Sequence, residues 1–241
     1  MPANMRKKTS WMGCDAYLFD IDGTLLRNRD RVHYDALNRA LRDVYGADAT
    51  IAGVAFHGMT DVGILRAALA RVEIGSQEFE GRLPAALACV REHVAEHAGA
   101  LNPLVCDAIP QVLERLHRSG KLVGVASGNL ESVGWHKIEA TGLRSYFRFG
   151  VFCDDHEQRV QVFARGITEV RTRLGDEATA CFVGDTPQDI VAAQQAGGRI
   201  ISVCTGIYKR EELEPLGPDF CISSCAELLS PVAPDTVPLR P

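Results

Sequence analysis

A short apolar run that ends in two carboxylates constrains this chain more than any other stretch. Residues 16–19 read Ala-Tyr-Leu-Phe, and Asp20 and Asp22 follow with one apolar residue between them. Continuous rather than alternating hydrophobicity is typical of a strand that is covered on both faces. In α/β sheets, ligands bind beyond the carboxyl ends of such strands. The sequence therefore predicts a buried strand at 16–19 with two acids at its functional end.

The two acids predict a cation site. Residues two apart in extended backbone project to the same side, so Asp20 and Asp22 should lie close together. Such a pair raises one pKa unless a cation or hydrogen bonds keep both ionised, and oxygen ligands beside a phosphate favour Mg²⁺. Gly23 allows a sharp bend, and Thr24 offers a hydroxyl and an amide to an anion. The alternative is an ordinary Asp-x-Asp-Gly turn.

Composition excludes several classes of partner. The chain has 241 residues, enough for one large domain or a domain with an insertion, and a net charge of −5. No basic block appears, so we expect no nucleic-acid partner. No apolar run is long enough to span a bilayer, and no apolar segment follows the basic opening, so we expect neither a membrane anchor nor a secretory signal. Eight scattered cysteines predict free thiols in the cytoplasm.

The chain after the first strand divides into a helical part and an alternating part. Segments 34–45, 62–72 and 83–97 carry apolar residues at helical spacing, with no strand pattern between them. We therefore expect a helical cap at 28–99, inserted into a core made of 14–27 and 100–230. Residues 1–13 and 231–241 are expected to be flexible tails.

From residue 101 onward, expected strands alternate with expected helices. The strands are expected at 121–126, 179–183, 199–203 and 219–222, and the helices at 108–118, after 127–129, at 160–173, 188–196 and 225–229. This alternation predicts an α/β fold with a doubly wound parallel sheet, that is, a Rossmann-like core.

Polar residues end two further predicted strands. Ser127, Gly128 and Asn129 open a predicted helix, where a hydroxyl, free amides and the helix dipole suit a phosphate, although Ser and Asn are also ordinary N-caps. Asp185 and Asp189 follow the strand at 179–183, and Asp189 could instead complement the dipole of its helix. Four carboxylates gathered at one sheet edge would be costly without a metal.

Three stretches together resemble a known family. They are Phe19 to Leu25 (FDIDGTL), Ala126 to Asn129 (ASGN) and Val183 to Ile190 (VGDTPQDI). In this order, and with helices between the first two, they resemble the haloacid dehalogenase-like hydrolase superfamily. The resemblance covers about residues 14–229 and is to the phosphoglycolate phosphatase-like branch, which has a helical cap after the first strand.

The resemblance implies a phosphatase acting on a small phosphorylated metabolite with Mg²⁺. Asp20 would be the nucleophile that forms an aspartyl-phosphate, and Asp22 the general acid and base. Ser127 and neighbouring amides would hold the phosphoryl oxygens. Mg²⁺ would lie among Asp20, the backbone carbonyl of Asp22 and Asp185, with Asp189 nearby.

One departure from the branch concerns a cation. Its members usually carry a Lys-Pro pair before the last acidic motif, and here residues 154–160 have none. Arg159 and Lys137 are equal candidates to replace that lysine. In relatives a cap loop faces the site, which makes His57 and Thr60 candidate substrate contacts.

Alternative activities remain within and outside this family. A sugar-phosphate mutase would use the same two acids and retain the phosphoryl group, whereas a dehalogenase would not need Asp22. A catalytically inactive phosphate-binding or scaffold protein is the alternative of another class. For the phosphatase we expect a small phosphorylated substrate as the partner and a monomer or homodimer.

Overall fold

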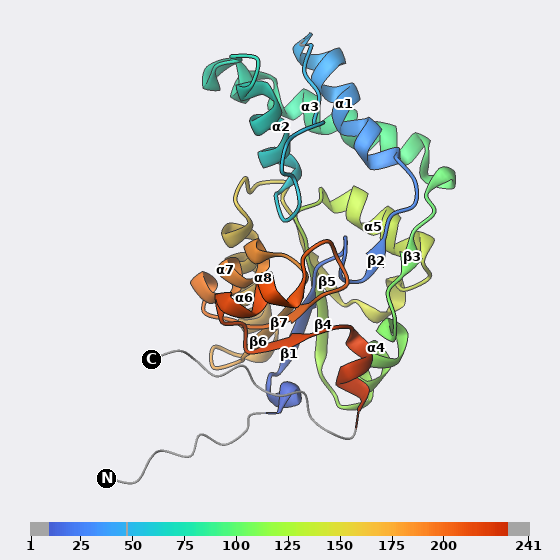
Figure 1. Ribbon diagram of the computed structural model, residues 1–241, viewed down its shortest axis with the longest axis vertical. Helices are drawn as coiled ribbons and strands as arrows, with labels where there is room; N and C mark the ends of the chain where they lie inside the picture. The colour runs from blue at the N-terminus through green and yellow to red at the C-terminus, as the bar shows by residue number, and fades with distance from the viewer. Residues whose placement is uncertain (1–9, 47, 231–241) are drawn as a thin grey trace.

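The sheet at the centre of the molecule is parallel throughout, and helices pack against both of its faces (Figure 1). The computed structural model describes residues 10–46 and 48–230. Six strands lie in the order β5-β4-β1-β6-β7-β8. Their bounds are Ala16–Phe19 (β1), Leu122–Ala126 (β4), Phe149–Val151 (β5), Ala180–Gly184 (β6), Arg199–Val203 (β7) and Phe220–Ile222 (β8). The arrangement confirms the predicted α/β class and doubly wound sheet.

The position of β1 explains its unbroken apolar sequence. It lies between β4 and β6, and all four of its residues are fully buried. Phe19, its last residue, aligns with Val125 of β4 and with Val183 of β6. Because the strands are parallel and in this register, the residues that follow β1, β4 and β6 meet at one edge of the sheet.

Each face of the sheet has its own apolar core. Leu18 packs toward the face covered by α6 (Arg159–Leu174) and α7 (Pro187–Ala196). Tyr17 and Phe19 point to the opposite face, which α4 (Ile109–Arg118) covers. The other core helices are α5 (Glu131–Ala140), which follows β4, and the short α8 (Arg210–Leu213). A strand that must bury both faces cannot alternate apolar and polar residues, which is the pattern read from the sequence.

The described cap residues form three α-helices, inserted after the first strand. They are α1 (Val32–Tyr45), α2 (Asp61–Ala70) and α3 (Ser76–Glu96). Two short antiparallel strands, β2 (Leu26–Arg27) and β3 (Leu104–Val105), pair where the chain passes between core and cap (Figure 1). Helix α3 begins earlier than the predicted residue 83. The sequence pattern missed its first turns because they are largely polar and only Phe79 marks their buried side.

Several other elements differ from the sequence prediction. Strand β5 was not predicted, since three residues are too few to show a pattern. The helix after residues 127–129 begins only at Glu131, with Leu130 as its N-cap, and residues 225–229 form a 3-10 helix. Residues 11–13, expected in a flexible tail, form a 3-10 helix in which Trp11 is buried against Tyr17. The predictions for 1–9 and 231–241 lie outside the described residues.

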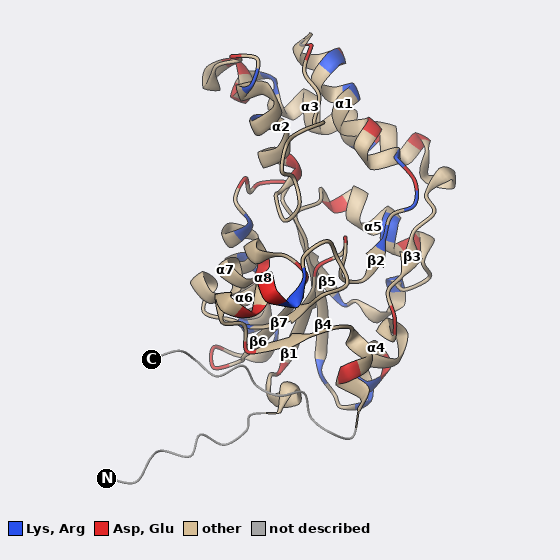
Figure 2. Ribbon diagram, viewed as in Figure 1, with Lys and Arg blue, Asp and Glu red and all other residues tan. Residues whose placement is uncertain are grey.

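Acidic and basic positions are interspersed along both the core and the cap (Figure 2). Within residues 10–46 and 48–230, no helix combines the length and the apolar character needed to cross a membrane.

The core face under α6 provides a test of packing. Phe182 of β6 is fully buried and stacks on Phe163 of α6 with ring centroids 4.1 Å apart. We expect Phe182→Ala to lower the free energy of unfolding by about 3–5 kcal/mol, because a ring-sized cavity replaces these contacts. Urea denaturation measures the change. The control Leu174→Ala, at a side chain 48% exposed, should change it by less than about 0.5 kcal/mol. Equal effects of the two substitutions would contradict this packing.

Candidate active site

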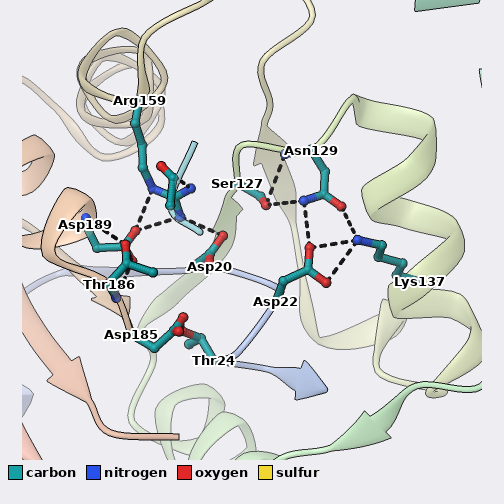
Figure 3. A network of polar contacts seen from close by, with 11 residues as sticks. Asp20, Asp22, Thr24, Ser127, Asn129, Lys137, Arg159, Asp185, Thr186 and Asp189 are labelled. Carbon is teal, nitrogen blue, oxygen red and sulfur yellow. Dashed lines mark hydrogen bonds and ion pairs between the residues drawn. The ribbon is translucent and has the colours of Figure 1, made fainter. Parts of the chain in front are cut away.

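Functional side chains gather at the carboxyl edge of the three central strands (Figure 3). Asp20, Ser127 and Asp185 are the residues that immediately follow β1, β4 and β6. The backbone amide of Asp20 still donates to the carbonyl oxygen of Val183 at 2.9 Å, so the ladder continues past the assigned end of β1. The sheet register thus holds these residues in fixed relative positions.

The chain bends sharply after β1, in the turn that carries Asp20 and Asp22. Gly23 has φ +90°, a left-handed conformation that favours glycine, and its amide donates to the carbonyl of Leu26 at 2.8 Å. The sharp bend expected at Gly23 is therefore present. The two acids then point to different neighbours, which are described in turn below.

Three buried carboxylates form an acidic cluster on one side of the site. Oxygens of Asp20, Asp185 and Asp189 all lie within 4.8 Å of one another. Arg159 Nη2 lies 2.8 Å from Asp20 Oδ1, and Arg159 Nε donates to Asp189 Oδ1 at 2.6 Å. One guanidinium therefore faces three carboxylates, and the cluster carries an excess of negative charge.

Burial and mutual repulsion shift the pKa values of this cluster. Burial is the largest cause for Asp20 and raises its pKa to about 6, with the charges of Asp189 and Asp22 adding to the effect and that of Arg159 opposing it. Burial also comes first for Asp185, and the charges of Asp189 and Asp20 help to hold its pKa well above the usual range. A bound cation would reverse both shifts, because it favours the ionised carboxylates.

The cluster has the donors and the space that a hard divalent cation requires. Asp185 Oδ1 accepts a hydrogen bond from Thr24 Oγ1 at 2.9 Å. A Cβ on Gly23 would lie 2.3 Å from Asp185 Oδ2, and one on Gly206 would lie 1.8 Å from it. Two glycines therefore keep the space around this oxygen open. Carboxylate oxygens alone favour Mg²⁺ or a similar ion, so the three acids could hold a metal.

Asp189 has a second, structural role. Its Oδ2 accepts from the amide of Thr186 at 2.9 Å, and its own amide donates to Thr186 Oγ1 at 3.2 Å, which forms a capping box at the start of α7. Its Oδ1 is occupied by Arg159. Asp189 therefore caps α7 and also belongs to the acidic cluster, and its role as a metal ligand stays a prediction.

Asp22 belongs to a separate ion pair with Lys137. Lys137 Nζ lies 2.7 Å from Asp22 Oδ2 and 3.0 Å from Oδ1, and it donates to Asn129 Oδ1 at 2.7 Å. Asn129 Nδ2 in turn donates to Asp22 Oδ2 at 2.8 Å. Burial would raise the pKa of Asp22, but the charge and hydrogen bonds of Lys137 outweigh it and lower that pKa to about 2. Asp22 is therefore ionised in this state.

Both candidate cations thus lie in the site, each beside a different acid. Arg159, the first residue of α6, contacts Asp20. Lys137 extends back along α5 with its side chain 1% exposed and contacts Asp22 instead of Asp20. Sequence spacing could not assign these partners, because the distance between helices α5 and α6 depends on how they pack on the sheet.

A histidine and an aspartate from the cap complete this part of the site, and neither was predicted. Lys137 Nζ lies 3.1 Å from His33 Nδ1, and His33 Nε2 lies 3.1 Å from Asp61 Oδ2. Asp61 Oδ2 also accepts from the amide of Leu130 at 2.8 Å. The chain of contacts links the cap to Asp22. No motif marks His33 or Asp61 in the sequence, since they meet only through packing.

The remaining predicted residues lie at differing distances from the cavity. Ser127 is fully buried, and its Oγ accepts from the side-chain amide of Asn129 at 3.3 Å. The cap loop packs on Gly128, where a Cβ would lie 2.4 Å from a backbone oxygen of that loop. His57 is exposed and lines the cavity. Thr60 is not brought to the cavity wall: it caps α2 and donates to the carbonyl oxygen of Glu157.

A cavity of about 640 Å³ lies between these core residues and the cap. Its core side includes Asp20, Asp22 and Asp185, and its cap side includes His33 and Tyr34. The volume is within the range typical of small-molecule sites, roughly 300–1,000 Å³.

Comparisons with known proteins agree with this geometry. The family model described as haloacid dehalogenase-like hydrolase matches residues 14–197. The protein named Probable phosphatase IndB from Dickeya dadantii is 27% identical over 220 residues, which cover 88% of this chain and 90% of that protein. Pyrophosphatase PpaX from Anoxybacillus flavithermus is 24% identical over 229 residues, 91% of this chain and 97% of that protein.

Solved structures share the fold at lower identity. CbbY from Rhodobacter sphaeroides, in complex with phosphate, has a TM-score of 0.66 and 18% identity, covering 89% of this chain and 96% of that one. A predicted phosphoglycolate phosphatase from Haemophilus somnus has a TM-score of 0.64 and 18% identity, covering 90% and 96%. The matches confirm the expected hydrolase family and agree with the expected phosphatase activity.

The raised pKa of Asp20 predicts a pH-dependent response to Mg²⁺. Without metal, the contribution of Asp20 to stability is present below its unfolded pKa near 3.8 and is lost as pH rises through about 6. Ionised Asp20 binds a cation better than its protonated form. We therefore expect excess Mg²⁺ to raise the Tm more at about pH 7.5 than at about pH 5, as measured by thermal unfolding.

Two variants control this measurement. Asp185→Asn should reduce the Mg²⁺-induced rise in Tm, because it removes a charged donor from the cluster. Asp43→Asn, at a cap residue 52% exposed and outside the cluster, should leave the rise as in the wild type. The same rise at both pH values would show that Asp20 does not take part.

Proposed function

Because the chain belongs to the haloacid dehalogenase-like hydrolase family, we propose that it is a Mg²⁺-dependent phosphatase acting on a small phosphorylated metabolite. The reaction would proceed through an aspartyl-phosphate on Asp20. One observation carries the proposal: Asp20 and Asp22 line the same cavity, yet each is held in its own ion pair. Two carboxylates in different electrostatic environments can take two different roles.

In the first step an Asp20 carboxylate oxygen would attack phosphorus while the bond from phosphorus to the ester oxygen breaks. Arg159 would compensate the negative charge of both Asp20 and the phosphate. Its Nη2 lies 2.8 Å from Asp20 Oδ1 and 2.6 Å from Asp189 Oδ1, so a phosphoryl oxygen beside Asp20 would share this positive charge. Burial lowers the pKa of Arg159, but Asp189 and Asp20 outweigh this and raise it, so its charge is permanent.

Asp22 would move the proton in both steps. The negative charge of the incoming phosphate would raise the pKa of Asp22, so that Asp22 takes up a proton from the solvent as the substrate binds. In the first step Asp22 would give this proton to the leaving alcohol oxygen and become ionised again. In the second step ionised Asp22 accepts a proton from the water that attacks the aspartyl-phosphate. The bond from phosphorus to Asp20 then breaks and inorganic phosphate leaves. Splitting one displacement into two lowers the barrier of each.

The rest of the site would bind the metal and the phosphoryl oxygens. Asp20 and Asp185 are the proposed carboxylate ligands, with the backbone carbonyl of Asp22, and Asp189 nearby. Mg²⁺, when bound, screens carboxylates from the phosphate and stabilises charge on the phosphoryl group. Ser127 and the neighbouring amides are the proposed contacts for phosphoryl oxygens, which requires the Ser127 hydroxyl to turn away from Asn129.

Substitution of each acid separates the two roles. Asp20→Asn should abolish hydrolysis of p-nitrophenyl phosphate with Mg²⁺, because the amide is not a nucleophile, while the fold measured by circular dichroism stays intact. Asp22→Asn should still accept a phosphoryl group from p-nitrophenyl phosphate, because p-nitrophenolate leaves without a proton, and should release that group slowly. Acid quenching and mass spectrometry should then show phosphorylated protein. Turnover at the wild-type rate in either variant would contradict the corresponding role.

The two cations should also be separable. Arg159→Met should lower kcat by about a hundredfold or more, because it removes a preorganised charge beside the nucleophile. Lys137→Met should raise the pKa of Asp22, so the acid limb of the pH–rate profile should move to higher pH. Arg159→Lys and Lys137→Arg keep the charge and should recover part of each effect. A loss of no more than a few-fold in both Met variants would mean that another residue supplies the charge.

A further inference from the structure

The cavity has two chemically different sides. Charged groups of the core line one side, and the cap lines the other with a wall of apolar side chains. This cap wall consists of Tyr34, Leu37, Ile51, Phe56, Met59 and Ile64. A phosphoryl group held at Asp20 would leave the rest of the substrate, its alcohol part, facing the cap wall.

Among the cap residues that the structure describes, no lysine or arginine lines this cavity. Among the described residues that line it, the charged side chains from the cap are the carboxylates Asp30 and Asp61. Burial lowers the pKa of His57, with Asp22 opposing, so that imidazole is largely neutral near neutral pH. Arg31 lies over the ring of Tyr34 at 4.2 Å, but its side chain is 69% exposed and pairs with Asp35.

Two of the three core cations that line the cavity are paired with carboxylates. Lys137 pairs with Asp22, and Arg159 pairs with Asp20 and Asp189. Arg27, in β2 on the core side, donates from Nε to the carbonyl oxygen of Thr205 at 2.9 Å and pairs with no carboxylate among the described residues, so its charge belongs to the core side of the cavity and not to the cap wall. A second anionic group on the substrate, pointing at the cap wall, would therefore meet apolar side chains and carboxylates, which makes its desolvation costly.

The cavity is large compared with a phosphoryl group alone. Five non-hydrogen atoms displace on the order of five water volumes, about 150 Å³. Most of the 640 Å³ therefore remains for the alcohol part of the ester. A two-carbon acid such as glycolate would leave much of the cap wall in contact with water.

We propose that the substrate is a phosphate monoester of an uncharged, largely apolar alcohol, large enough to contact Phe56 and the rest of the cap wall. The proposal rests on the phosphatase activity proposed above. Phe56 is half-buried, and its ring is tilted by 32° to that of His57 with centroids 4.6 Å apart, so a flat apolar group has an aromatic surface to contact. Apolar burial at the cap wall then selects the alcohol.

A panel of primary alkyl phosphates tests this selection, because their leaving alcohols are of similar reactivity. It comprises phenethyl phosphate, ethyl phosphate, phosphoglycolate and propanediol bisphosphate, each assayed with Mg²⁺. We expect kcat/KM for phenethyl phosphate to exceed that for each of the others by about tenfold or more, since each apolar contact adds to discrimination. Equal values, or a preference for phosphoglycolate or the bisphosphate, would overturn the proposal.

Three variants locate the selection at the cap wall. Phe56→Ala should reduce the ratio of kcat/KM for phenethyl over ethyl phosphate by several-fold. Phe56→Lys should shift preference toward phosphoglycolate, because it adds the positive charge that the cap lacks. Val72→Ala changes a cap side chain that is 39% exposed and does not line the cavity, and it should leave the ratio as in the wild type. An unchanged ratio in Phe56→Ala would overturn the assignment.

A binding measurement separates this proposal from the proposed activity. Titration calorimetry of phenethyl and ethyl phosphate into Asp20→Asn needs no turnover. We expect phenethyl phosphate to bind about tenfold tighter and with a more negative heat-capacity change, the mark of apolar burial. If the wild-type protein hydrolyses no ester, p-nitrophenyl phosphate included, but the variant shows this difference in binding, the proposed activity is wrong and the selection at the cap wall is confirmed. If the protein hydrolyses p-nitrophenyl phosphate but binds the two alkyl phosphates equally, it is a phosphatase and the selection at the cap wall is wrong.

Discussion

Excess negative charge, buried at one edge of a parallel sheet, is the constraint on which the site depends. Three carboxylates within 4.8 Å of one another would repel strongly in a poorly hydrated position. The fold counters this repulsion with Arg159, with the hydrogen bonds of Thr186 and Thr24, and with raised pKa values. Thr24 and Thr186 follow the central strands β1 and β6, and Arg159 begins the helix that follows the edge strand β5. The charge balance therefore depends on the sheet register and on where α6 packs.

Two separate ion pairs let the two acids behave differently although one residue separates them in sequence. Arg159 faces Asp20 in a deeply buried position, and Lys137 faces Asp22 near the cavity. The pKa of Asp20 is raised to about 6 while that of Asp22 is lowered to about 2. The difference follows from the surroundings, because the two side chains are chemically identical.

The cap is bound to the core beside Asp22 and Gly128. The contact from Asp61 through His33 to Lys137 reaches Asp22, and the backbone amide of Asp61 donates to the carbonyl of Gly128 at 2.8 Å. The apolar cap wall lies across the same cavity. A substrate that contacts this wall would therefore also influence how firmly the cap holds the Lys137–Asp22 pair.

The sequence by itself determined the fold class, the helical nature of the cap and the positions of two pairs of acids, Asp20 and Asp22 after β1 and Asp185 and Asp189 after β6. These features depend on local patterns: an unbroken apolar run, helical spacing and acids after strands. Only the tertiary structure decided that Arg159 pairs with Asp20 and Lys137 with Asp22, that His33 and Asp61 join the site, and that Thr60 caps a helix away from the cavity. Those outcomes depend on distances between helices packed on a twisted sheet, which no spacing along the chain encodes.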